Sequence, residues 1–190
     1  VSCLLSASCS SQQSGKGDTI KSTNIGNITE NEDKGIKEMI SIYGGEYEYG
    51  YSKSVDFNTE SKMAIWVEVR KSEGVENFKV DPKLLTSNMA FLFYRNLKEE
   101  KKKYNEIQVK IIKNNGEHIE DAYSASDLEI VTNRYNVINQ VFSLIKNKDF
   151  ASLKDHIIID PENGVANSDD LIDGIKSLEA KLGKIEELSP

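Results

Sequence analysis

The segments KMAIWVEVR (62–70), DPKLLTSNMAFLFYRNL (81–97) and YNEIQVKII (104–112) decide the fold of this chain. Apolar residues occupy every second position of the first segment: Met63, Ile65, Val67 and Val69. This period of two predicts a strand with one apolar face. In the second segment, Asp81 can cap a helix and Pro82 suits its first position, so we expect a helix from Pro82 to about Leu97. The third segment predicts another strand.

The residues on either side extend this unit into a larger domain. Tyr47, Tyr49 and Tyr51 alternate with Glu46, Glu48 and Gly50, which predicts a strand whose tyrosines pack against the next strand. A short helical face precedes it: Ile36, Met39, Ile40 and Tyr43. Asn115-Gly116 is typical of a hairpin turn and leads into a strand from Glu117 to about Tyr123. The sequence therefore predicts an α+β fold, with a β-β-α-β-β domain over residues 34–125.

Residues 126–190 are expected to be helical. Ser126 and Glu129 match the capping-box pattern at the start of a long helix. Its apolar residues recur at intervals of three and four: Leu128, Val131, Tyr135, Ile138, Phe142 and Ile145. Asp149 can cap a short helix and Ser168 a third one, which Gly183 ends. Lys184 to Leu188 then begins an extended run.

This order of helices, with the break Asn147-Lys148-Asp149-Phe150 and the ending Leu182-Gly183-Lys184-Ile185, resembles the helical first half of NTF2-like domains of bacterial lipoproteins. The resemblance covers residues 126–188. It implies a curved sheet after residue 190 and a concave pocket that binds a ligand. Two alternatives stay open: a truncated NTF2-like domain, or a small helical segment packed on the first domain.

The first nine residues suggest where the protein resides. Small residues lead to Cys9, and a Ser-, Gln- and Gly-rich stretch follows, which resembles a bacterial lipoprotein signal. Ser6 stands where such signals usually carry Leu, and Cys3 is the rival lipidation site. We expect residues 1–9 to be the remnant of a signal, residues 10–33 a flexible tether, and the chain a fragment at both ends. The expected location is the bacterial envelope, lipid-anchored at the outer membrane or cell surface.

Composition limits the chemistry and the partners. The net charge is −7, from 31 acidic and 24 basic residues, which argues against nucleic acid or an anionic membrane surface as the main partner. Both cysteines lie in the first nine residues, so the rest of the chain has no disulfide and no thiol nucleophile. We expect the membrane to be contacted only through the lipid anchor, with a protein or a small molecule as the ligand.

Two histidines are the candidates for chemistry. His118 has acidic neighbours in sequence, and His156 follows Asp155, so either could act as a base or as a metal ligand. Residues 160–164 with Asp169 and Asp170 offer oxygen ligands for calcium, but they fail the EF-hand spacing. No catalytic triad, phosphate-binding glycine loop or zinc motif is present in the sequence, so no catalytic residue, metal or cofactor is predicted.

These observations favour an envelope-anchored lipoprotein that acts as a binding or interaction module. The alternative is a small envelope hydrolase that uses His118 or His156 with nearby carboxylates.

Overall fold

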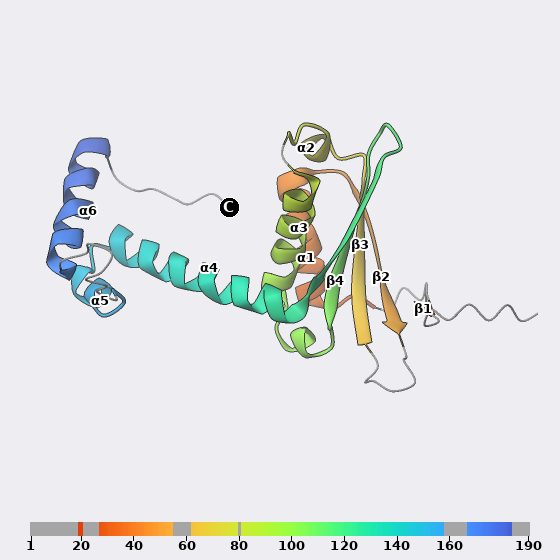
Figure 1. The fold of residues 1–190 in the computed structure, drawn as a ribbon, viewed down its shortest axis with the longest axis horizontal. Helices are drawn as coiled ribbons and strands as arrows, with labels where there is room; N and C mark the ends of the chain where they lie inside the picture. Colours follow the sequence, from red (N-terminus) through yellow and green to blue (C-terminus); the bar gives the residue numbers. More distant parts are fainter. Residues whose placement is uncertain (1–18, 21–26, 55–61, 80, 158–166, 184–190) are drawn as a thin grey trace, which may run out of the picture. The chain divides into compact units, whose positions relative to one another are not determined.

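A computed structural model describes residues 19–20, 27–54, 62–79, 81–157 and 167–183. The chain divides into two compact units, Val1–Leu128 and Glu129–Pro190, and the boundary falls inside a helix. The first unit combines a mixed sheet with helices (Figure 1), which confirms the predicted α+β class.

The sheet of the first unit has the strand order β1-β2-β3-β4-β5. Its strands are β1 (Thr19–Ile20), β2 (Glu46–Ser54), β3 (Lys62–Arg70), β4 (Glu106–Ile112) and β5 (His118–Ser124). Only β3 and β4 are parallel neighbours, and the other pairs are antiparallel. Parallel neighbours need a long connection, and α2 (Glu73–Glu76), α3 (Pro82–Asn96) and the 3-10 helix η1 (Glu99–Lys102) form it.

Helices cover one face of this sheet. Helix α1 (Glu30–Tyr43) contacts α3, and Figure 1 shows the two helices on the same side of the strands. The predicted alternation in β3 is confirmed, because Ile65, Val67 and Val69 are buried under the helices. Tyr47, Tyr49 and Tyr51 also pack against this core. Among the described residues of the first unit, no helix lies on the second face of the sheet (Figure 1).

Helix α1 begins earlier than the sequence analysis placed it. Thr29 caps the helix and Glu32 completes a capping box, so residues 30–33, assigned to the tether, are helical. Thr19 and Ile20, also assigned to the tether, pair with Ser54 and Lys53 of β2. The capping box was readable in the sequence as Thr29-Glu30-Asn31-Glu32 and was overlooked.

The connection at residues 71–79 contains the helical turn α2, which the side chain of Ser72 caps. Val75 is buried and Phe78 packs against the core, so this segment returns to the core before α3 begins.

Strand β5 passes directly into α4 (Ala125–Lys146). The Ser124 hydroxyl accepts a hydrogen bond from the Asp127 N–H at 3.1 Å, so Ser124 caps the helix and the predicted cap Ser126 does not. The reason is that the Ala125 N–H donates to the Asn105 carbonyl. This hydrogen bond extends the strand pairing to Ala125, the first helical residue, so the capping position falls on Ser124. The predicted hairpin turn at Asn115-Gly116 is confirmed, with Gly116 at φ 83°.

The edge strand β5 carries one acidic side chain on its covered face. Asp121 accepts a hydrogen bond from the Thr86 hydroxyl of α3 at 2.6 Å, and Thr86 itself is fully buried. The Tyr123 hydroxyl lies 2.7 Å from the same Thr86 oxygen and donates to the Lys83 carbonyl at 3.0 Å. These contacts fix β5 to α3.

The second unit contains the rest of α4, α5 (Phe150–Lys154) and α6 (Ser168–Leu182). Leu153 and Ile172 are buried. Val131 and Ile138, on the apolar face that the helical period predicts, are 45% and 49% exposed, so the described part of the second unit leaves much of this face uncovered. The helical period was right, but it does not tell whether a neighbouring element covers the apolar face.

Gly35 sets the distance between α1 and α3, and its replacement tests that contact. A Cβ at position 35 would lie 2.9 Å from the Phe93 carbonyl oxygen, a backbone atom that cannot turn away. We predict that Gly35→Ala lowers the free energy of unfolding by about 1–2 kcal/mol, because overpacking outweighs the gain in helix propensity. Urea unfolding followed by circular dichroism measures it. Gly174→Ala, in open space on α6, is the matched control, and an equal loss there would contradict the explanation.

Candidate functional site

The two histidines do not form a reactive site in the part of the chain that the structure describes. His118 is exposed at the start of β5. His156 is exposed beyond α5, where its ring nitrogens lie 2.8 Å from the Gln140 amide nitrogen and 2.9 Å from the Ser152 carbonyl. Among the described residues neither histidine hydrogen-bonds to a carboxylate.

Other predicted positions are not brought together either. Cys3, Cys9 and residues 160–164 lie outside the described residues. Asp169 and Asp170 are exposed in the first turn of α6, where the Asp170 N–H donates to the Asn167 side chain. Within the described ranges no three metal-ligating side chains gather.

A buried carboxyl group organises the polar contacts of the first unit. The Glu32 side chain of α1 is only 1% exposed. It accepts hydrogen bonds from the Thr29 N–H at 2.8 Å, from the Tyr51 hydroxyl of β2 at 3.0 Å, and from the Tyr104 hydroxyl. The Tyr51 and Tyr104 rings stack with 6.2 Å between their centroids. This cluster joins helix α1, strand β2 and the segment just before β4.

The tyrosines of this cluster hold their protons strongly. Burial, together with the hydrogen bond to the Glu32 carboxylate and its charge, raises the pKa of Tyr51 to about 12. The same causes raise the pKa of Tyr104 further. Both hydroxyls therefore stay donors over the physiological range, and their role in the cluster is structural.

A second carboxylate is held at the end of the same helix. Burial opposes the charge of Glu100, but hydrogen bonds from backbone N–H groups and from the Asn31 side chain outweigh it and lower its pKa to about 2. The Asn31 amide lies 3.1 Å from both Glu100 oxygens. Glu100 thus stays charged and anchors η1 to α1.

The helix-free face of the sheet holds an aromatic side chain. The register places Gly50, Trp66, Gln108 and Ala122 in one row across β2, β3, β4 and β5. The Trp66 indole covers Gly50 so closely that a Cβ there would lie 2.4 Å from the ring. Trp66 is half-buried, and it is the only tryptophan in the chain. In the row on one side of Trp66, Ser52 and Ala64 are only 9% and 5% exposed.

Charged side chains cover the other end of this face. The next row is Glu48, Glu68, Lys110 and Glu120. Lys110 pairs with Glu120 at 3.3 Å, and Arg70, one row further, pairs with Glu68 and with Glu48. His118 lies beside Ile112 in that last row, about 13 Å along the strand from Ala122. We call the surface formed by Trp66, Gln108, Glu48, Glu68, Lys110 and Glu120 the Trp66 face.

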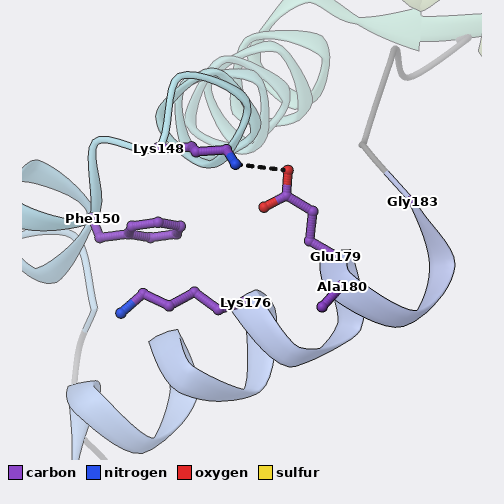
Figure 2. Close-up of a pocket in the computed structure, with 6 residues that line it drawn as sticks. All are labelled: Lys148, Phe150, Lys176, Glu179, Ala180 and Gly183. Atoms are coloured by element: carbon purple, nitrogen blue, oxygen red, sulfur yellow. Dashed lines mark ion pairs between the residues drawn. The ribbon is translucent and has the colours of Figure 1, made fainter.

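The second unit has a hollow of its own, of about 500 Å³. Figure 2 shows the Phe150 ring pointing into it between Lys148 and Lys176. Lys148 pairs with Glu179 at 3.6 Å, and the Lys176 ammonium lies 5.2 Å from the centre of the Phe150 ring. Ala180 and Gly183 complete the described lining, which includes neither histidine.

Comparisons with profiles of known protein families, with curated proteins and with solved structures found no match to this chain. In the described part of the chain, none of the helices has the length and apolar character needed to cross a membrane.

The Trp66 face was not among the sites predicted from the sequence, where Gly50 entered only as part of the alternation with the tyrosines of its strand. The available signal was a glycine inside a strand, which often marks a close approach by another group.

The Glu32 cluster predicts a specific loss of stability at high pH. The folded pKa of Tyr51 exceeds the value near 10 of an unfolded tyrosine, so its contribution is complete below pH 10 and is lost as the pH rises toward 12. Wild type should therefore be more stable than Tyr51→Phe at pH 8, and the difference should shrink above pH 10. Urea midpoints across this range measure it. Tyr49→Phe, whose hydroxyl makes no bond to Glu32, should show no such convergence.

Proposed function

We propose that this protein is an envelope-anchored binding module and that its Trp66 face contacts the ligand. The observation that carries the proposal is the Trp66 indole, held over Gly50 on the sheet face opposite α1 and α3, where the described residues of the first unit place no helix. A half-buried aromatic ring surrounded by polar groups is typical of binding surfaces. The neighbouring rows offer amide and carboxylate groups that can orient a ligand.

The contacts of the histidines favour binding over hydrolysis. A general base needs a nearby partner that orients it and a pocket that receives the substrate. His118 and His156 are both exposed, and neither lines the hollow of the second unit. The hydrolase alternative has no supporting contact among the described residues.

The location and the fuller fold belong to the same proposal. The small-residue run before Cys9 supports lipid attachment at Cys9, or else at Cys3, and hence a place at the outer membrane or cell surface. Residues 126–188 as part of an NTF2-like domain stay a prediction. The exposed apolar residues Val131, Ile138 and Leu178 support it, because the sheet of such a domain would cover helical faces of this kind.

Metabolic labelling tests the anchor. We predict that the full gene, expressed in a bacterium with labelled palmitate, yields a labelled protein. Cys9→Ala should abolish the label, or Cys3→Ala should if the rival site is used. Ser8→Ala, next to the preferred site, is the control and should keep the label. A protein whose label does not depend on either cysteine contradicts lipidation at these positions.

Trp66 emission tests the binding surface. Because the chain has a single tryptophan, its fluorescence reports directly on the Trp66 face. We predict that at least one of three bacterial envelope fractions, namely glycans, lipids or detergent-extracted proteins, shifts this emission in a saturable way. Trp66→Phe should weaken the interaction when it is measured by calorimetry. Phe150→Leu, in the separate hollow, is the control, and unchanged emission with all three fractions would contradict the proposal.

A further inference from the structure

We propose that the ligand of the Trp66 face is an uncharged oligosaccharide. This inference rests on the proposed function and adds the chemical class of the ligand. A sugar ring presents C–H groups on its faces and hydroxyl groups around its edge. It therefore needs an aromatic surface with hydrogen-bonding groups beside it, and both are present on this face.

The aromatic part of the surface is fixed in place. The indole lies against the Gly50 backbone, with Cζ2, Cε2 and Nε1 all within 3 Å of where a Cβ would stand. Any larger residue at position 50 would push the ring away from the strand. An aromatic side chain that is already immobilised loses little conformational freedom when a ligand packs against it.

The charges of the face argue for an uncharged ligand. Arg70 is engaged by Glu68 and Glu48, and Lys110 by Glu120. These two cations are therefore committed to carboxylates, and the five side chains together carry a small negative excess. An anionic ligand would meet these three carboxylates and also Glu106, which lies beside Gln108, while a cationic one would have to compete with Arg70 and Lys110.

The polar groups lie at a spacing that suits a sugar. Gln108 is the direct neighbour of Trp66 on β4, and Glu68 follows Trp66 by two residues on the same face of β3. Strand geometry places such neighbours about 5–7 Å away from Trp66, which is close to the width of one sugar ring. The Gln108 amide donates to Glu106 and keeps its carbonyl oxygen as an acceptor for a hydroxyl. The carboxylates also accept more than one hydrogen bond each.

Titration of the full chain with defined glycans tests the inference. The probes are the neutral hexasaccharides of glucose in α- and β-linkage and of N-acetylglucosamine, with hyaluronan as the anionic comparison. We expect at least one neutral probe to change the Trp66 emission, with a dissociation constant that does not depend on salt. Trp66→Ala should weaken binding about tenfold or more in calorimetry, and Trp66→Tyr should retain part of the affinity.

Gly50→Ala separates the binding surface from general stability. The new methyl group displaces the indole, so we expect weaker binding by a protein whose circular dichroism still shows the folded state. Gly174→Ala, with nothing within 4 Å, is the matched control and should bind as wild type does. If Gly50→Ala and Trp66→Ala bind the neutral probes as tightly as wild type, the proposed surface is wrong.

The outcomes distinguish this inference from the function on which it rests. Binding of hyaluronan alone, or affinity that falls with salt, would overturn the uncharged class. The uncharged class would also be overturned if no glycan changed the Trp66 emission while the protein or lipid fraction did. In all of these cases the proposal of a binding module would stand. No response of Trp66 to any glycan or envelope fraction would overturn both.

Discussion

The carboxyl group of Glu32 is the constraint on which the first unit depends. It sits in the core at 1% exposure and has hydrogen-bond donors from three places in the chain. Leaving such a group without partners costs on the order of 1–3 kcal/mol, and more when it is charged. Helix α1, strand β2 and the segment before β4 must therefore all be in their native positions around Glu32, since the absence of any one of them leaves the carboxyl group short of a hydrogen-bond donor. The apolar contacts around Glu32 are not directional and can form in several arrangements of the elements. Its hydrogen bonds require one specific arrangement.

This constraint also separates the two faces of the sheet. Tyr51 points toward α1 to reach Glu32, so Gly50 and Ser52 must point to the opposite face because successive side chains alternate. The glycine then leaves room for the Trp66 indole from the neighbouring strand. The surface that we propose for binding is thus set by the same register that satisfies the buried carboxyl.

Local patterns in the sequence predicted much of the first unit. The alternation in residues 62–70 and the cap at Asp81 depend only on near neighbours, and the strand and helix follow from them. The prediction of the residue that caps α4 was wrong, because Ser124 and Ser126 are equally suitable by local sequence. The hydrogen bond from the Ala125 N–H to the distant Asn105 carbonyl decides between them. The contacts of Glu32 with Tyr104 and of Gly50 with Trp66 join residues far apart in sequence. A single sequence does not reveal cross-strand register. The glycine inside β2 could indicate a close approach by another group, but it could not identify that group as Trp66.

The position of Asp121 affects how copies of this protein behave when crowded. Sheet edges invite pairing with other chains, and β5 is an edge strand of the described sheet. A strand added beside it would have to cover the carboxylate of Asp121, which is already tied to Thr86. An inward-pointing charge of this kind discourages such pairing. Molecules held side by side at high density on one surface could then remain separate, each with its sheet available to a partner of a different kind.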